Sequence, residues 1–168
     1  MPAVLIALAL SLGQIPQATP PAELKSLDFL IGSWRGKVEF ISEGKPQTAV
    51  AEWTFRTEGN HLRQVGTVQL SGMKMEESRA YGWDARRKRF WSYALVEPFA
   101  TPRVEWGTYK LGELVWLSEP WDIGAAEGPV ESRATTTRDG AALRFRIDVK
   151  RKAGWEKVAE GRFTKEPD

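Results

Sequence analysis

The sequence predicts an all-β fold, an antiparallel up-and-down β-barrel with one short N-terminal helix plugging one end. After residue 31 the chain alternates apolar and polar residues with the period of two that a strand requires. Turn-forming residues divide this region at intervals of about 8–12 residues, which gives about ten strands. No long helical pattern interrupts them, which excludes the βαβ units of a parallel sheet. A meander of hairpins loses its sheet edges when it closes into a barrel.

The length and composition are those of an ordinary globular domain. The chain has 168 residues, enough for one domain with a sizeable core. Charged residues make up 27% and hydrophobic residues 42%, so disorder is not indicated. The formal net charge of +2 predicts no nucleic-acid partner. There is no Cys, which excludes disulfides, zinc–thiolate sites and cysteine nucleophiles.

The N-terminus is typical of a secretory signal peptide. An apolar run from Pro2 to Gly13, PAVLIALALSLG, is too short to span a membrane and is followed by the proline-rich QIPQATPP. We expect residues 1–18 to be removed, with cleavage between 13 and 22, so that no stable membrane span is left. The protein is then exported to the periplasm or secreted. The alternative is a buried or membrane-anchoring N-terminal helix.

The first predicted element of the mature domain, residues 22–166, is a helix from Ala22 to Leu30. Proline suits the first turn of a helix, and Glu23 favours its positive end. Its leucines share one face: Leu24, Leu27 and Leu30. The helix must end by Gly32, where the first strand begins.

The alternation of the strands is clearest in three segments. Each has one apolar face, which we expect to be buried, and one polar face in water, where we also expect most of the Asp and Glu residues. The apolar sets are Trp34, Gly36, Val38 and Phe40; Ala49, Ala51, Trp53 and Phe55; and Leu143, Phe145, Ile147 and Val149.

Three motifs resemble a bacterial lipocalin-like, calycin-type family of unassigned function. They are Leu27-x-x-Leu30-x-Gly32-x-Trp34, the segment AYGWD at 80–84 and the closing segment GWEKVAEGRFTK at 154–165. The resemblance implies that a basic side chain of the last strand, Arg162 or Lys165, covers the ring of Trp34. Such a contact is a cation–π interaction. Gly32 then permits close backbone packing, and the indole of Trp34 closes the barrel end that the helix plugs.

No catalytic, metal or cofactor site is predicted. The single histidine, His61, cannot supply a Ser-His-Asp triad or a multi-His metal site. Some related ten-stranded barrels, the nitrobindin-like ones, bind haem through a histidine near the C-terminal end, where this chain has none. Acidic residues such as Glu76 and Glu77 lack the spacing of a calcium loop or an acid–base pair.

Two surface segments have alternative interpretations. The basic run Arg86–Arg89 lies between Trp83 and Trp91. It fits a solvated hairpin turn better than a single-stranded nucleic-acid site, because the net charge is balanced. The long segment Glu119–Glu131, with an exposed-looking Trp121, is either a flap over one barrel end or a tolerated insertion.

The aromatic residues lead to two functional hypotheses. Trp and Tyr offer flat apolar walls with one donor each, which suits a small, largely apolar ligand inside a hollow barrel. The predicted function is therefore an exported, non-enzymatic ligand-binding barrel. The alternative is a barrel with a filled core that acts as a protein-interaction or scaffold module, through the 119–131 segment or the basic turn. The candidate ligand-lining residues are Trp53, Phe55, Trp91, Tyr93, Trp106, Trp116 and Phe145.

Overall fold

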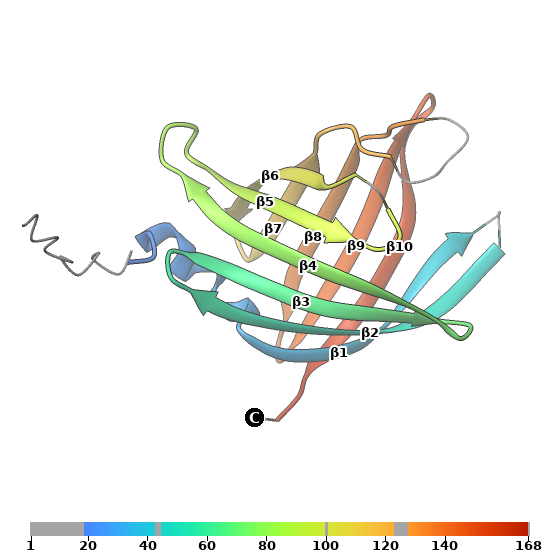
Figure 1. The fold of residues 1–168 in the computed structure, drawn as a ribbon, viewed down its shortest axis with the longest axis horizontal. Coiled ribbons are helices and arrows are strands. Elements are labelled where there is room, and N and C mark those ends of the chain that lie inside the picture. The colour runs from blue at the N-terminus through green and yellow to red at the C-terminus, as the bar shows by residue number, and fades with distance from the viewer. Residues whose placement is uncertain (1–18, 43–44, 100, 123–127, 168) are drawn as a thin grey trace, which may run out of the picture.

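The fold is a closed antiparallel barrel of ten strands (Figure 1). A computed structural model describes residues 19–42, 45–99, 101–122 and 128–167. Each strand pairs with its neighbours in the sequence, and the first strand pairs with the last. The predicted up-and-down barrel is therefore confirmed. The predicted signal peptide, residues 1–18, lies outside the described residues.

The elements follow the sequence in simple order. They are η1 (Ala22–Leu30), β1 (Gly32–Ser42), β2 (Lys45–Glu58), β3 (His61–Leu70), β4 (Met73–Asp84), β5 (Arg89–Val96), β6 (Arg103–Lys110), β7 (Glu113–Ser118), β8 (Ser132–Asp139), β9 (Ala142–Arg151) and β10 (Gly154–Lys165).

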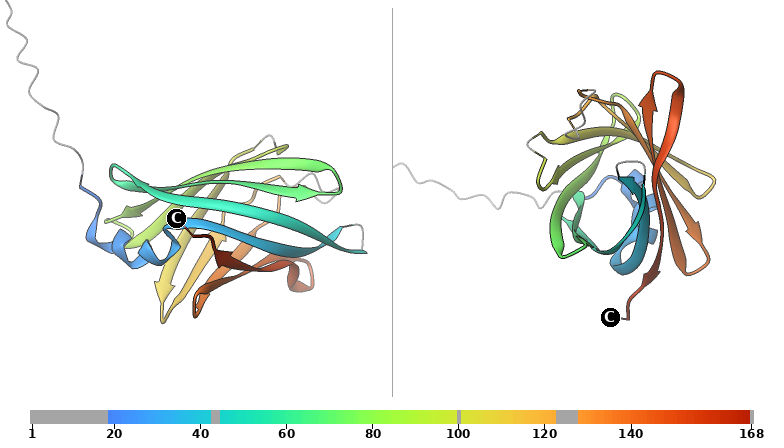
Figure 2. Two further views of the ribbon diagram at one scale, coloured as in Figure 1. Left: turned by 90° about the horizontal axis from the view of Figure 1, so that it is seen from below. Right: turned by 90° about the vertical axis from the view of Figure 1, so that its right-hand side faces the viewer.

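The short helix η1 plugs one end of the barrel, which we call the closed end (Figure 2). It is a 3₁₀-helix, with i→i+3 bonds from the amide of Leu24 to the carbonyl of Pro21 and from that of Ile31 to that of Asp28. Its three leucines belong to the hydrophobic core: Leu24, Leu27 and Leu30. The predicted plug and its apolar face are confirmed.

Trp34 seals the closed end as the sequence predicts. Its side chain is only 5% exposed, and its indole N–H donates to the carbonyl of Leu30 at 2.6 Å. β1 pairs with β10 so that Trp34 lies opposite Lys165, whose Nζ is 5.9 Å from the ring centroid. Arg162 instead forms an ion pair with Asp139 at 2.9 Å. Of the two basic residues that the sequence left open, Lys165 covers the indole.

Gly32 is required by this closure. Its φ is +119°, a conformation that residues with a Cβ rarely adopt. A Cβ at this position would also collide with the side chain of Lys165. The glycine thus lets the end of β10 cross the start of β1 while the lysine reaches the Trp34 ring.

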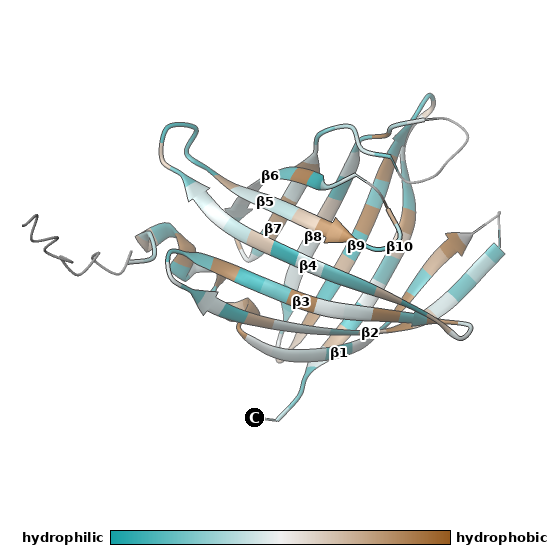
Figure 3. Cartoon of the chain, viewed as in Figure 1, coloured by the Kyte–Doolittle hydropathy of each residue, from teal (hydrophilic) through white to brown (hydrophobic). Residues whose placement is uncertain are grey.

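The hydrophobic core fills the barrel next to the closed end. Trp53 stacks on Phe163 with ring centroids 3.9 Å apart and meets Phe145 edge-on at 5.1 Å. Tyr81 contacts Phe55 at 6.1 Å and Trp116 at 5.4 Å, so the rings form a connected series across the interior. Figure 3 shows the alternation behind this packing as hydrophobic and hydrophilic bands along β9 and β10.

Candidate functional site

The structure divides the seven candidate ligand-lining residues into two groups. Trp53, Phe55 and Trp116 belong to the core, the partly buried Phe145 packs against it, and all four contact other rings there. The other three, Trp91, Tyr93 and Trp106, lie on the outer face of β5 and β6, and Tyr93 is 44% exposed. For these three the expectation of an interior position is wrong.

The reason is that β5 and β6 present small and charged residues to the interior. On β5 the buried positions are Phe90, Ser92 and Ala94. On β6 they are Arg103, Glu105 and Gly107, and Trp116 of β7 lies against that glycine. An alternating strand can turn either of its two sets of residues inward, and the choice of Trp91, Tyr93 and Trp106 as ligand-lining residues selects the wrong set for β5 and β6.

The buried charges form an ionic cluster inside the barrel. Glu105, which has no solvent exposure, accepts bonds from Arg79 Nη1 at 2.7 Å and from the Ser92 hydroxyl at 2.9 Å. Arg103 Nε lies 3.1 Å from its other carboxylate oxygen. Arg79 also donates to Glu77 at 2.5 Å, so two arginines and two glutamates neutralise one another. Glu105 is an exception to the expectation that most acidic residues face water.

Burial governs the ionisation of this cluster. It raises the pKa of Glu105, against the opposing effects of Arg79 and Ser92. Burial also disfavours the charge of Arg79, but the neighbouring carboxylates of Glu105 and Glu77 favour it, and the pKa of Arg79 is raised. Arg79 therefore stays charged, and the phenol of Tyr81, whose pKa burial also raises, stays neutral and donates to Gln64.

Trp121 covers the cluster from the 119–131 segment. It is 8% exposed, so the expectation of an exposed ring is wrong. Its ring contacts Phe99 at a centroid distance of 5.4 Å, and the Arg103 guanidinium lies 4.9 Å from its centroid. Its indole N–H donates to the Ser132 hydroxyl, and its backbone pairs with Val130. Residues 123–127 of this segment lie outside the described residues.

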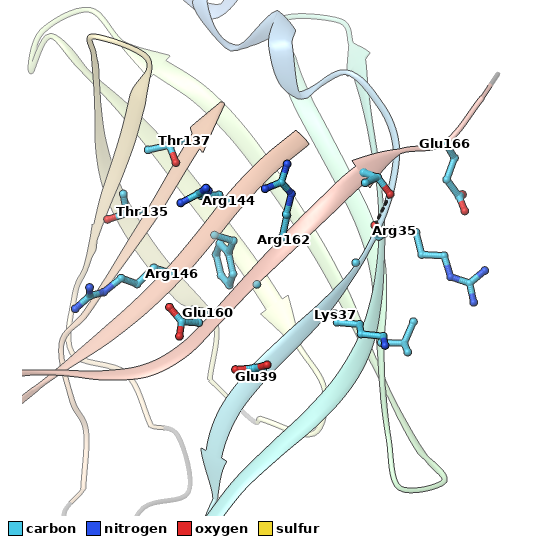
Figure 4. Close-up of a pocket in the computed structure, with 15 residues that line it drawn as sticks. Arg35, Lys37, Glu39, Thr135, Thr137, Arg144, Arg146, Glu160, Arg162 and Glu166 are labelled. Atoms are coloured by element: carbon cyan, nitrogen blue, oxygen red, sulfur yellow. Dashed lines mark hydrogen bonds between the residues drawn. The ribbon is translucent and has the colours of Figure 1, made fainter. Parts of the chain in front are cut away.

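Two pockets of the described part of the chain open on the outer surface, with volumes of about 1030 Å³ and about 500 Å³. The larger one, which we call the outer groove, crosses β1, β10, β9 and β8 (Figure 4). Five basic residues line it: Arg35, Lys37, Arg144, Arg146 and Arg162. Three acidic residues also do so: Glu39, Glu160 and Glu166.

The strand register places three cations of the outer groove in one row. Arg144 on β9 lies opposite Arg162 on β10, which in turn lies opposite Lys37 on β1. Figure 4 shows the two arginine side chains next to each other. Both contact one oxygen of Asp139, at 3.0 Å from Arg144 and 2.9 Å from Arg162. Within the described residues, Lys37 forms no ion pair, so the only carboxylate paired with this row of three cations is Asp139, which contacts its two arginines.

The remaining charges of the groove are paired differently. Arg146 donates to Asp148 at 2.5 Å, and Arg133 binds the same carboxylate at 3.0 Å. Asp148 is buried beneath these arginines, which corrects the expectation that it faces water. Its burial acts to raise its pKa, but the bonds and charges of the two arginines outweigh this and lower it. Glu160 is bound by Lys157 outside the groove.

The other candidate segments show no catalytic arrangement in the described part of the chain. His61 Nε2 lies 3.9 Å from a carboxylate oxygen of Glu58. No group of three or more His, Cys, Asp or Glu side chains there is placed to hold a metal ion. None of the helices described is long and apolar enough to cross a membrane. The basic run 86–89 begins in the turn between β4 and β5, and Arg87 stacks on the ring of Trp106 at 4.4 Å.

Comparisons with known proteins identify the fold alone. No family model and no curated protein sequence matches this chain. Among solved structures it is similar to the crystal structure of Rv2717c from M. tuberculosis, with a TM-score of 0.68 and 13% sequence identity. The match covers 89% of this chain and 100% of that one. At this identity the likeness supports the barrel, while the resemblance to a lipocalin-like family stays a prediction.

Proposed function

We propose that this chain is a non-enzymatic binding protein whose filled barrel supports the outer groove, and that the groove binds a small molecule carrying two or more anionic groups. The observation that carries the proposal is the row of Arg144, Arg162 and Lys37. Its two arginines share the carboxylate of Asp139, and its lysine has no ion-pair partner within the described residues. Like charges directly opposite on neighbouring strands destabilise a sheet. An anionic ligand would relieve this repulsion.

The size and chemistry of the groove support the proposal. Its volume of about 1030 Å³ is at the upper end of the range for small-molecule sites. Arginine forks match phosphate and carboxylate oxygens in pairs of hydrogen bonds, and Thr137, opposite Arg144, adds a hydroxyl donor. Adjacent strands lie about 4.8 Å apart, so the row suits anionic groups that are separated by a few bonds.

Isothermal titration calorimetry with pyrophosphate and with citrate tests the proposal and separates phosphate from carboxylate ligands. We expect binding of at least one of them that weakens as salt is added. The variant Lys37→Gln/Arg162→Gln should lose this binding. The matched control Arg56→Gln/Lys74→Gln removes two exposed, ion-paired cations elsewhere and should retain it. Equal losses in both variants, or no binding of either anion, would refute the proposal.

A second candidate function is the binding of a small, largely apolar ligand inside the barrel. The indole N–H of Trp53 favours it, because this buried donor has no acceptor within the described residues. Fatty acids and hydrophobic dyes should then shift the tryptophan emission of the protein but leave a Trp53→Phe variant unchanged. An unchanged emission in the native protein would exclude this function.

We also propose that the protein is exported, on the basis of the signal-like residues 1–18. N-terminal sequencing of the protein from cell fractions tests this. A mature chain that begins between residues 13 and 22 in the periplasm or the medium is the expected result. Recovery of an uncleaved chain in the cytoplasm would contradict export.

A further inference from the structure

The outer face of β5, β6 and β7 carries a continuous apolar surface. Its six residues, which we call the aromatic patch, are Trp91, Tyr93, Leu95, Val104, Trp106 and Leu117. Tyr93, Leu95 and Leu117 are 44%, 53% and 46% exposed. Figure 3 shows the end of β5 in the hydrophobic colour. Exposed apolar surfaces of this kind mark sites of interaction with proteins or membranes.

The register makes the patch contiguous. Trp91 lies opposite Trp106, which lies opposite Leu117, so one row crosses three strands. Tyr93 lies opposite Val104 in the next row. On the β4 side, the Trp91 ring lies directly against Gly82, where a side chain would collide with it. The patch is therefore a broad face of the sheet, and the Trp91 ring covers the glycine of the neighbouring strand β4.

A basic cluster adjoins the patch at the closed end of the barrel. Arg86, Arg87, Lys88 and Arg89 are all exposed. Arg87 pairs with Asp84 and stacks on Trp106, which joins the turn to the patch. The other three form no ion pair within the described part of the chain. Two sets of acidic groups border the patch. Glu119 accepts the indole N–H of Trp106 at 3.0 Å. At the other end, Leu95 lines the smaller pocket together with Glu52, Glu76, Glu77 and Glu97.

We infer that the aromatic patch and the basic turn together dock this protein on the surface of an anionic lipid bilayer. Trp and Tyr rings favour the boundary between headgroups and acyl chains, where one end of the ring is apolar and the other is wet. Lys and Arg next to such a surface are attracted by anionic headgroups. Half-exposed Leu95 and Leu117 supply the apolar contact, and the three unpaired cations supply the charge complementarity.

This orientation is compatible with the outer groove. In the closed strand order, β5 and β6 lie across the barrel from β10 and β1. A protein docked by its aromatic patch therefore keeps the Lys37 and Arg162 part of the groove on the side away from the lipid, while the β8 edge of the groove adjoins β7 of the patch. The inference does not depend on the function proposed for the groove, because the two surfaces share no residue.

Co-sedimentation of the mature protein with vesicles tests the inference. We expect binding to vesicles of phosphatidylglycerol and phosphatidylcholine, and much weaker binding to phosphatidylcholine alone. Arg86→Gln/Lys88→Gln/Arg89→Gln should weaken binding about 100-fold, because each cation contributes about fivefold. Tyr93→Ser/Leu95→Ser should weaken it about tenfold through lost apolar contact.

Matched variants elsewhere on the surface separate docking from general effects. Lys45→Gln/Lys74→Gln/Lys152→Gln removes the same charge, and Ile41→Ser/Met73→Ser changes two residues of similar exposure, 51% and 55%. Both controls should bind like the unmodified protein, and urea unfolding should show that every variant is folded. Equal weakening in the controls would overturn the inference. So would a dimer in sedimentation velocity that Tyr93→Ser/Leu95→Ser dissociates, without any vesicle binding.

Discussion

Replacing Trp34 by Ala should strongly destabilise the barrel, because it removes the side chain that seals the closed end. The indole is 5% exposed and packs beside η1, under the ammonium group of Lys165. The substitution leaves a cavity between the helix and the first strand. It also leaves the carbonyl of Leu30 without the donor that now lies 2.6 Å away.

The magnitude follows from these two losses. Truncation of a buried Trp to Ala costs about 3–5 kcal/mol in transfer and cavity terms. An unpaired carbonyl adds about 1 kcal/mol, at the low end for a buried group because water can enter at the barrel end. We therefore expect a loss of about 4–6 kcal/mol, a large part of the ~5–15 kcal/mol of a typical domain. Trp34→Phe keeps an aromatic ring but loses the N–H donor, and it should cost about 1–2 kcal/mol.

Urea unfolding followed by far-ultraviolet circular dichroism measures these losses without relying on tryptophan emission. A lower midpoint with an unchanged slope indicates a loss of stability in the native state. Lys165→Met serves as a control for the cation–π contact and should cost about 0.5–1 kcal/mol. A loss below about 1 kcal/mol for Trp34→Ala would mean that the side chain is not a plug, and it would refute this account of the closed end.

Two further predictions concern the interior. Burial raises the pKa of Glu105 in the folded state above its ordinary value of 4.5, so the folded chain holds this proton more tightly than the unfolded one. Stability should therefore fall as pH rises from about 4.5 through the raised pKa. Glu105→Gln should remove this pH dependence. Urea unfolding at several pH values gives the free energy of unfolding of both proteins. If the native protein's value minus the variant's stays constant or rises with pH, the prediction is wrong. Gly107→Ala would place a Cβ 2.5 Å from the Trp116 ring and should cost about 1–3 kcal/mol in urea unfolding, whereas exposed Thr108→Ala should change little.

The local features of the fold could be predicted from the sequence because they depend on neighbouring residues. The alternation around Trp34 and Trp53 reports burial of one strand face directly, and both residues are in the core. Gly59 and Gly140 stand at turns with positive φ, as their positions between apolar runs indicate. The leucines of η1 lie on one face at helical spacing, so the apolar face of the plug can also be predicted from the sequence.

The placement of charges could not be predicted in the same way. In β6, RVEWGTYK, either alternate set of residues could face the interior. The polarity of the single residues favours Trp106 inside and Glu105 outside. The opposite is found because Arg79, 26 residues away in the chain, brings a cation to Glu105 within the barrel. A buried charge is tolerated only with such a partner, and the partner is a property of the closed sheet.

The strands, the turns and the plug at Trp34 can be predicted from local sequence, because each depends on the hydrophobic period and on residues with special backbone freedom. Which basic residue covers Trp34 depends instead on contacts between distant strands. Arg162 and Lys165 are three positions apart and so lie on opposite faces of β10, and the pairing of β1 with β10 selects the lysine. The same pairing aligns Lys37 with Arg162 in the outer groove. Registers between distant strands are set when the barrel closes, and no local pattern encodes them.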